Sequence, residues 1–366
     1  MQRESRVVKV RDVKIGGGLP PVVQGMAKSN PLDTEKIIEE VKRLKEAGAK
    51  IVRIAIPNVK AARNIPLIKE KVDIPLAADV HFNYRLALEV IDRGIDKVRI
   101  NPGNLSPAGI LQVARKAKEK EIPLRVGVNS GSLPKEIIEK ISKNEENYSK
   151  RQTFMAEAMV DTALKCVRLL EKDGFEDIII SLKSSEVPVT LLANRMIARE
   201  VSYPIHIGIT ATGPSSEGIV KSAVGIGSLL SEGIGDTVRV SLTADSVEEV
   251  KVAYQILNSL NIYLEGPVII SCPTCGRCRG DVGLIIREIQ KEARKIKSPL
   301  RVAVMGCEVN GPGEAMEADI GVACTRQGGV LFKKGRLLNR VKKDEIVPSL
   351  LRELQSMDRD FQEKKG

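Results

Sequence analysis

Eight short β-rich segments recur along the first part of the chain, and each is followed by a stretch in which apolar residues have helical spacing. Strands that alternate with helices build right-handed βαβ units around a parallel sheet. Eight such units in roughly 250 residues match a closed barrel better than an open sheet. The sequence therefore predicts an α/β protein with a (β/α)8 barrel of the TIM type. The expected strands are Val22–Met26, Ile51–Ile56, Pro75–Val80, Lys97–Asn101, Pro123–Val128, Ile178–Lys183, Ile205–Thr210 and Thr237–Leu242.

The pattern changes after Leu264, where a Gly-Pro break precedes a strand that runs directly into a group of cysteines. The rest of the chain, about a hundred residues, has the pattern of a small α+β unit. We therefore predict a barrel domain at residues 1–264 and a small α+β domain at residues 265–366. Its expected elements are a strand at Val268–Ser271, a helix at Val282–Lys295, strands at Leu300–Met305 and near Ile320–Ala323 and Val330–Lys333, and a helix from Lys343.

The charge of the chain indicates the kind of partner it binds. It contains 58 Lys and Arg against 47 Asp and Glu, a net charge of +11, so its long-range field favours anionic substrates or acidic partners. Aromatic residues make up only 3% of the chain and no run of five or six basic residues occurs, so we do not expect nucleic-acid binding. The apolar runs are strand-sized, and the charged N-terminus lacks an apolar segment. We therefore expect no membrane span, no signal peptide and a cytoplasmic location.

Basic residues recur at the carboxyl ends of the predicted strands, where barrels of this type assemble their chemistry. A ring of like charges costs free energy unless an anion neutralises it, and the arginine fork suits phosphate oxygens. The glycine-containing loops Pro102–Asn104 and Asn129–Ser132 add backbone N–H donors. We therefore predict a site for a compact diphosphate, although any one of these residues could instead pair with an acidic residue on the rim. The basic residues are Arg53, Arg99, Arg125, Lys183 and Arg239.

Uncharged and acidic polar residues share the same strand ends. For the two histidines, His81 and His206, a structural role is an equal alternative to a catalytic one. The other residues of this kind are Asp79, Asn101, Asn129 and Ser241.

Four of the six cysteines lie close together in the sequence, which indicates metal or redox chemistry in a cytosolic protein. A zinc ribbon would need a second, distant C-x-x-C motif, and a thioredoxin-type pair would leave Cys307 unexplained. The spacing of Cys272, Cys275 and Cys307 therefore favours an iron–sulfur cluster, with zinc or free thiols as alternatives. Either Cys278 or Glu314 could be the fourth ligand, and an oxygen ligand would leave an exchangeable, Lewis-acidic site for substrate. The remaining cysteines, Cys166 and Cys324, are predicted to be structural.

The most specific stretches of the sequence are Ala78–Leu88, Val98–Asn104, Arg125–Leu133, Lys221–Leu242, Cys272–Arg277 and Met305–Ala315. Together they resemble the bacterial 4-hydroxy-3-methylbut-2-en-1-yl diphosphate synthase family of the non-mevalonate isoprenoid pathway, in its two-domain form. The resemblance covers nearly the whole chain. It implies a reaction in which 2-C-methyl-D-erythritol 2,4-cyclodiphosphate is opened and reductively dehydroxylated to (E)-4-hydroxy-3-methylbut-2-enyl diphosphate with two electrons.

The resemblance also implies a cofactor, partners and site residues. The cofactor is a [4Fe–4S] cluster held in the second domain by Cys272, Cys275, Cys307 and Glu314, with Asn310 nearby. The donor is ferredoxin or flavodoxin, both acidic, which suits a basic protein. In the family, a homodimer shares its active sites, because the cluster domain of one subunit closes over the barrel of the other. The implied substrate-binding residues are Arg53, Arg99, Asn101, Arg125, Asn129, Lys183, Arg239 and Ser241, and the candidate catalytic residues are Asp79, His81, Asn310 and Glu314.

The sequence departs from the family pattern in three places. Thr210-Ala211-Thr212-Gly213 stands where the family has Thr-Glu-Ala-Gly, so a carboxylate associated with proton delivery is absent. Asp79, His81 or a water held by the two threonines could replace it. The first strand also departs from the family's Gln-Ser-Met-Thr, and Cys278 is an extra thiol. Three other functions are alternatives: an iron–sulfur electron carrier or sensor, a related reductase of another phosphorylated substrate, and a basic RNA-binding protein.

Overall fold

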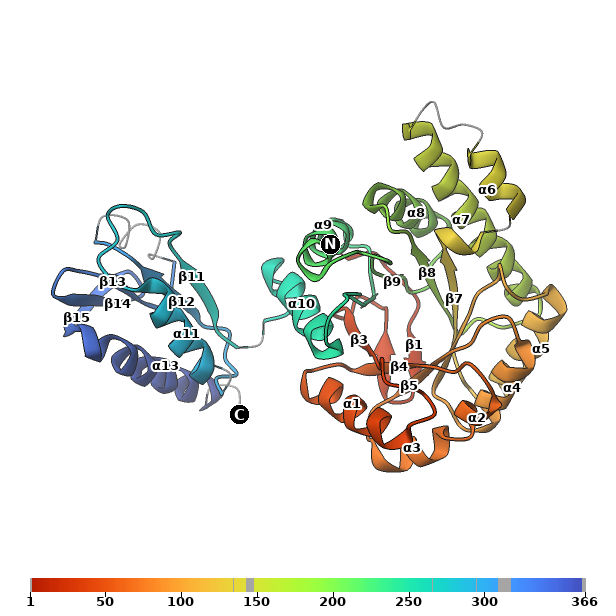
Figure 1. Ribbon diagram of the computed structural model, residues 1–366, viewed down its shortest axis with the longest axis horizontal. Coiled ribbons are helices and arrows are strands. Elements are labelled where there is room, and N and C mark those ends of the chain that lie inside the picture. The colour runs from red at the N-terminus through yellow and green to blue at the C-terminus, as the bar shows by residue number, and fades with distance from the viewer. Residues whose placement is uncertain are drawn as a thin grey trace. The chain divides into compact units, whose positions relative to one another are not determined.

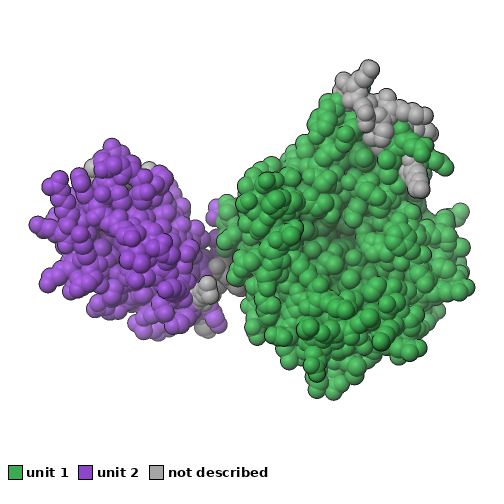
Figure 2. Space-filling view, in the orientation of Figure 1, with its two compact units in different colours: residues 1–260 green, residues 261–366 purple. Residues whose placement is uncertain are grey.

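The computed structural model of the protein describes residues 2–133, 135–142, 148–264, 266–293, 295–308 and 317–363. The chain divides into two compact units, Met1–Leu260 and Asn261–Gly366, which Figure 2 shows in different colours. The sequence analysis placed the boundary after Leu264, at the Gly-Pro break. The first unit contains the barrel, and the second contains the clustered cysteines.

Eight parallel strands form the barrel of the first unit (Figure 1), which confirms the predicted fold. The strands are β3 (Val22–Met26), β4 (Ile51–Ala55), β5 (Leu76–Asp79), β6 (Lys97–Ile100), β7 (Leu124–Asn129), β8 (Ile178–Lys183), β9 (His206–Ile207) and β10 (Thr237–Val238). They are hydrogen-bonded in the order β8-β7-β6-β5-β4-β3-β10-β9. A parallel bridge between Ile180 and Ile205 joins the two ends of this order. Along each strand, side chains alternate between the lumen and the surrounding helices.

β9 and β10 are shorter than the sequence analysis predicted, with 2 residues each. A Cβ atom on Gly208 would lie 2.3 Å from the carbonyl oxygen of Arg239, so glycine is needed where these two chains approach each other. Farther along, Thr212 Oγ1 donates a hydrogen bond to the carbonyl oxygen of Ser241 at 2.6 Å. The segments that follow β9 and β10 are therefore held together by these two contacts and not by the regular backbone hydrogen bonds of the sheet.

Helices surround the barrel and connect its strands (Figure 1). They are α1 (Thr34–Glu46), α2 (Val59–Ala62), α3 (Ile65–Lys71), α4 (Tyr84–Asp92), α5 (Pro107–Glu119), η1 (Ser130–Ser132), α6 (Lys135–Ser142), α7 (Tyr148–Lys172), α8 (Val187–Glu200), α9 (Ser215–Ser231) and α10 (Ser246–Ser259). In α1, the Asp33 side chain caps the first turn by accepting a hydrogen bond from the Lys36 N–H at 3.2 Å. Val41 and Leu44 are buried, and Gly48, with φ +103°, follows the last turn.

An N-terminal hairpin that the sequence analysis did not predict covers the amino-terminal end of the barrel. Its strands, β1 (Val8–Val10) and β2 (Val13–Ile15), pair antiparallel. Ile15 is buried in one apolar cluster with Val22 and Ile51, the first residues of β3 and β4. The hairpin thus closes this end and leaves the carboxyl-terminal end of the barrel for the site.

The second unit is a five-stranded sheet with two helices packed on one face. Its elements are β11 (Val268–Ser271), α11 (Val282–Ala293), β12 (Arg301–Met305), β13 (Ile320–Cys324), β14 (Gly328–Lys333), β15 (Arg336–Lys342), η2 (Lys343–Glu345) and α13 (Ile346–Glu363). The strand order follows the sequence, with β11, β12 and β13 parallel and β14 and β15 antiparallel to their neighbours. β15 was not predicted, because as an exposed edge strand it lacks a buried apolar face. Within the described residues, no helix has the length and apolar character needed to cross a membrane.

Candidate active site

The five basic residues predicted at the strand ends converge in the lumen of the barrel. Arg99 on β6 lies opposite Asp79 of β5 and opposite Arg125 of β7 in the parallel ladder. Arg125 is close enough to Arg53 and Arg239 for both charges to affect its pKa. Each of the five is buried or half-buried, and the set is Arg53, Arg99, Arg125, Lys183 and Arg239.

Asp79 is the carboxylate at the centre of this group. One oxygen accepts a hydrogen bond from Arg99 Nη1 at 3.1 Å, and the other lies 3.9 Å from Arg53 Nε. His81 Nε2 is 3.5 Å from Asp79 Oδ1 and 2.6 Å from Arg99 Nη1. Burial by itself would raise the pKa of Asp79, but the charge of Arg53, the hydrogen bond from His81 and the charge of Arg99 hold it well below its ordinary value. Asp79 is therefore ionised at neutral pH and orients the side chains around it.

Several guanidinium nitrogens in the lumen have no hydrogen-bond partner among the described residues. Arg125 is 2% exposed, and neither its Nε nor its Nη1 bonds to a described residue. The same is true of Nε in Arg99 and in Arg239. Burial, and then repulsion from Arg53 and Arg99, lowers the pKa of Arg125 well below its ordinary value. Because buried donors without partners are costly, these atoms mark where the oxygens of an anion would fit.

Two buried lysines each contact a neutral side chain. Lys183 Nζ is 3.0 Å from His206 Nε2, and His206 Nδ1 is 2.5 Å from Thr237 Oγ1. Burial, and then the charge of Lys183, lowers the pKa of His206 well below its ordinary value, so the ring is neutral and accepts from the lysine. Lys97 Nζ donates a hydrogen bond to Gln24 Oε1 at 2.8 Å. These contacts position Lys183 and Lys97 within the lumen.

The sequence analysis missed two of these lumen residues, Lys97 and Gln24. Lys97 precedes Arg99 by two positions on β6, so strand alternation places both on the lumen side and could have revealed it. The sequence contained no comparable signal for Glu249, which lies on α10 and whose Oε2 is 3.5 Å from Arg239 Nη2. Its Oε1 accepts a hydrogen bond from the backbone N–H of Leu242 at 2.7 Å.

Basic side chains outnumber carboxylates in the lumen. Among the described residues, only Asp79 and Glu249 come within ion-pair distance of its basic side chains. Burial, reinforced by repulsion from Arg239, lowers the pKa of Arg53 to about 9. A bound polyanion would relieve this repulsion. The six basic residues are Arg53, Lys97, Arg99, Arg125, Lys183 and Arg239.

The other predicted polar residues shape the loops at the mouth. Asn101 Oδ1 accepts a hydrogen bond from the Gly103 N–H at 3.1 Å. The Asn129 N–H donates to Ser132 Oγ at 3.1 Å, and the carbonyl oxygen of Ser241 accepts from Thr212 Oγ1. Ala211, where the family has glutamate, is exposed and has a φ of +49°.

The clustered cysteines gather around the carboxyl end of β12 in the second unit. The Gly306 N–H donates a hydrogen bond to Cys272 Sγ at 3.1 Å. A Cβ atom on Gly306 would lie 2.6 Å from Cys278 Sγ and 3.2 Å from Cys272 Sγ, so the backbone is packed between two sulfur atoms. Backbone hydrogen bonds to cysteine sulfur are among the interactions that tune iron–sulfur sites. Gly306 immediately precedes Cys307 and is a site residue that the sequence analysis missed.

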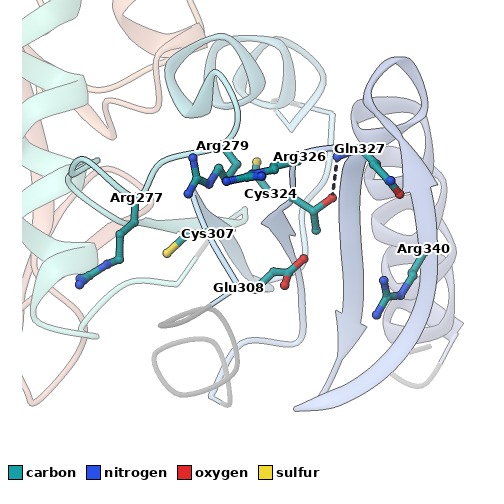
Figure 3. Close-up of a pocket in the computed structure, with 9 residues that line it drawn as sticks. Arg277, Arg279, Cys307, Glu308, Cys324, Arg326, Gln327 and Arg340 are labelled. Carbon is teal, nitrogen blue, oxygen red and sulfur yellow. Dashed lines mark hydrogen bonds between the residues drawn. The ribbon is translucent and has the colours of Figure 1, made fainter.

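Cys324 belongs to the same neighbourhood, which its distance in the sequence concealed. Burial, and then the proximity of Cys278, Cys272 and Cys307, raises the pKa of the Cys324 thiol to about 11. Cys324 and Cys307 line one cavity of about 400 Å³ (Figure 3). Cys166, on α7, is instead a core thiol, 3% exposed, and burial raises its pKa to about 12.

The donor set fits an iron–sulfur cluster, although its ligands are not gathered within the described residues. There, no three Cys, His, Asp or Glu side chains form a group that could hold a metal ion. Cys275 is exposed, and the predicted residues Asn310 and Glu314 lie outside the described residues. The fit rests on soft sulfur donors from two segments and on Gly306, whose missing Cβ leaves space between two sulfur atoms.

Comparison with known proteins identifies the family. The GcpE TIM-barrel domain matches residues 5–254, and the GcpE protein C-terminal domain matches residues 268–356. A protein of Caldanaerobacter subterraneus subsp. tengcongensis, named 4-hydroxy-3-methylbut-2-en-1-yl diphosphate synthase (flavodoxin), is 50% identical over 358 residues that cover 98% of each chain. A protein of the same name from Fusobacterium nucleatum subsp. nucleatum is 49% identical, and the alignment covers 100% of each chain. Among solved structures, a dihydropteroate synthase of Yersinia pestis has a TM-score of 0.48 and 14% identity, covering 70% of this chain and 98% of that one. With both family domains matched and relatives about half identical along its whole length, the chain belongs to the GcpE family of 4-hydroxy-3-methylbut-2-en-1-yl diphosphate synthases.

Proposed function

We propose that the protein converts 2-C-methyl-D-erythritol 2,4-cyclodiphosphate to (E)-4-hydroxy-3-methylbut-2-enyl diphosphate. The conversion opens the ring, consumes two electrons and two protons, and releases one molecule of water. The observation that carries the proposal is the excess of buried basic side chains in the lumen, with guanidinium nitrogens that have no hydrogen-bond partner in the described part of the chain. This excess matches a substrate with two phosphate groups, and it occurs in a chain about half identical to relatives named for this synthase.

The lumen arginines would bind the diphosphate. The nitrogens without partners in Arg99, Arg125 and Arg239 are free to donate to phosphate oxygens, and fork-shaped donation holds such oxygens in a defined orientation. Arg53 and Lys183 lie beside them; burial, and then the charges of Arg125 and Arg239, lowers the pKa of Lys183, and a bound diphosphate would favour its charged form. We assign the remaining substrate contacts to the residues at the mouth of the barrel, Asn101, Asn129 and Ser241.

Proton handling falls to His81 in this proposal. Asp79 is a poor proton donor at neutral pH, because its pKa is held far below its ordinary value. It instead orients Arg99 and His81, whose Nε2 is 3.5 Å from its carboxylate. We expect the proton to move from the His81 ring, since Ala211 cannot supply the carboxylate that the family has at its position.

We propose that Cys272, Cys275, Cys307 and Glu314 hold a [4Fe–4S] cluster, with Asn310 beside it. When bound, such a cluster supplies electrons and an iron with Lewis-acid character. The hydrogen bond from the Gly306 N–H to Cys272 Sγ supports this assignment. It would stabilise the thiolate form that a cluster ligand requires.

The test is anaerobic turnover of the cyclic diphosphate by protein reconstituted with iron and sulfide, using reduced methyl viologen as the donor. We expect the allylic diphosphate to appear in the phosphorus NMR spectrum, and Arg125→Met to abolish it while keeping its iron and sulfide content. If loaded wild-type protein forms no product and its EPR spectrum does not change on adding the cyclic diphosphate, the chain is an electron carrier or sensor instead.

A homodimer with shared active sites also belongs to the proposal, and it rests on the family resemblance. Mixing separately inactive Arg125→Met and Cys307→Ser proteins should then restore part of the activity, because a mixed dimer contains one site with an intact barrel and intact cluster ligands. A mixture that stays inactive, although sedimentation shows that mixed dimers form, would contradict shared sites.

A further inference from the structure

Four arginines surround the cavity that contains Cys307 in the second unit. Figure 3 shows that they come from separate segments: Arg277 and Arg279 from the loop after β11, Arg326 from the turn between β13 and β14, and Arg340 from β15. The strands β11, β12 and β13 are parallel, so their carboxyl ends lie at the same edge of the sheet. The arginines are therefore brought together by the fold at the edge where the cysteines lie.

These arginines form a positive surface with little compensation. All four are exposed, and none of them forms an ion pair with a described residue. Among the described residues that line the cavity, Glu308 is the one acidic side chain against the four arginines. Clustered like charges that are not neutralised within the chain raise the local potential and attract an oppositely charged partner.

The same edge also offers apolar surface. Leu338 lies two residues before Arg340 on β15, where the pairing with β14 shifts register. Leu338 is 42% exposed. Complexes between redox proteins have small interfaces in which charge steers the encounter, so a basic rim beside an apolar residue is sufficient for such a partner.

We propose that Arg277, Arg279, Arg326 and Arg340 form the docking surface for an acidic flavodoxin that delivers electrons to the cysteine site. This rests on the proposed function and adds where the donor binds. Relatives that are 49% and 50% identical carry flavodoxin in their printed names. Electron transfer slows steeply with distance, and Cys307 lines the very cavity that the arginines surround. The flavodoxin is oxidised as it supplies the two electrons of the reduction, and no bond forms at the surface itself.

The test uses Arg326→Glu/Arg340→Glu, because these two residues are distant in sequence from the proposed cluster ligands. Reduced flavodoxin and reduced methyl viologen are compared as donors to the iron-loaded protein. We expect the KM for flavodoxin to rise about tenfold or more, since like charges then face the acidic donor. Iron and sulfide content, the KM for the cyclic diphosphate and the viologen-driven rate should not change. Higher salt should raise the KM of the wild-type protein for flavodoxin toward that of the variant, because salt screens the attraction between the charges.

Arg359→Glu is the control variant on the same unit, and it reverses one charge where the test variant reverses two. Arg359 is exposed on α13 and follows Ile346, the first residue of that helix, by 13 positions. At 1.5 Å per residue it lies about 20 Å along the helix from that end. Because α13 begins directly after β15 and η2, Arg359 is remote from the cysteine edge. The control should leave the KM for flavodoxin within about twofold of the wild type.

Three results would overturn the docking surface. One is an unchanged KM for flavodoxin in Arg326→Glu/Arg340→Glu, and another is an equal rise in Arg359→Glu. The third is a rise in the KM for the cyclic diphosphate with viologen, which would make the arginines part of the substrate site. If wild-type protein does not turn over even with viologen, the proposed function fails instead. Calorimetry of oxidised flavodoxin binding to the iron-loaded wild type and variants then still tests whether the arginines form the docking surface.

Discussion

Replacing Asp79 by asparagine should destabilise the barrel strongly when no ligand is bound. The carboxylate lies 3.1 Å from Arg99 Nη1 and 3.9 Å from Arg53 Nε, inside a lumen that already has an excess of positive charge. Removing one partner of a buried ion pair costs about 3–5 kcal/mol, because the remaining charge loses its compensation. For a domain of this size, each kcal/mol lowers Tm by about 2–4 °C, so we expect Tm to fall by about 6–20 °C.

Thermal unfolding followed by circular dichroism, with and without pyrophosphate, measures this effect. Pyrophosphate at 100 times its Kd adds about 2.7 kcal/mol to a protein that binds it only when folded. At one fixed concentration, it should raise the Tm of Asp79→Asn more than that of the wild type, because the variant lumen is more positive. Asp73→Asn is the control: Asp73 also pairs with an arginine, Arg11, but its side chain is 85% exposed. Its Tm should change by less than about 2 °C.

The dependence on pH gives a second check on Asp79. Its pKa in the folded protein is held below the unfolded value of about 3.9, so its stabilising contribution is complete above that value and is lost as the pH falls below it. The difference in Tm between the wild type and Asp79→Asn should therefore be constant from about pH 5 to 8 and should shrink below about pH 4. If Asp79→Asn raises Tm at neutral pH, the cost of burying the carboxylate exceeds its attraction to the arginines, and our reasoning about the lumen is wrong.

Three further predictions test the site. Gly306→Ala should lower the iron and sulfide content measured after reconstitution, because the added Cβ would lie 2.6 Å from Cys278 Sγ; full loading would show that the backbone there can move. Glu314→Ala should lose both cluster and turnover while Cys278→Ser keeps both, and the opposite result in EPR and activity assays would reverse the ligand assignment. Ala211→Glu should raise the turnover rate without changing the product, since a positioned acid contributes about 10²–10⁴-fold; an unchanged rate would leave proton delivery to His81.

Local patterns in the sequence were sufficient for the fold class and for the strand-end positions of the basic residues in the candidate site. The alternation of β-rich and helical segments predicted the barrel, because each βαβ unit has few ways to pack. The same rule placed Arg99 and Arg125 at strand ends, where they meet in the lumen. The spacing of Cys272 and Cys307 identified the region around which Gly306 and Cys278 gather. These features depend on residues near one another in the chain, so they can be read from it directly.

Only the tertiary structure decided which charges share one environment. Glu249 on α10 forms an ion pair with Arg239, and Lys97 on β6 donates a hydrogen bond to Gln24 on β3, which lies far earlier in the chain. Arg326 and Arg340 likewise reach the cavity of Cys307 from different segments of the second unit. The pKa of a buried group depends on its desolvation and on every charge within a few ångströms, whatever the separation in sequence. The sequence by itself thus determined the types of residue available at each strand end, and the closure of the barrel and the sheet determined their electrostatic neighbours.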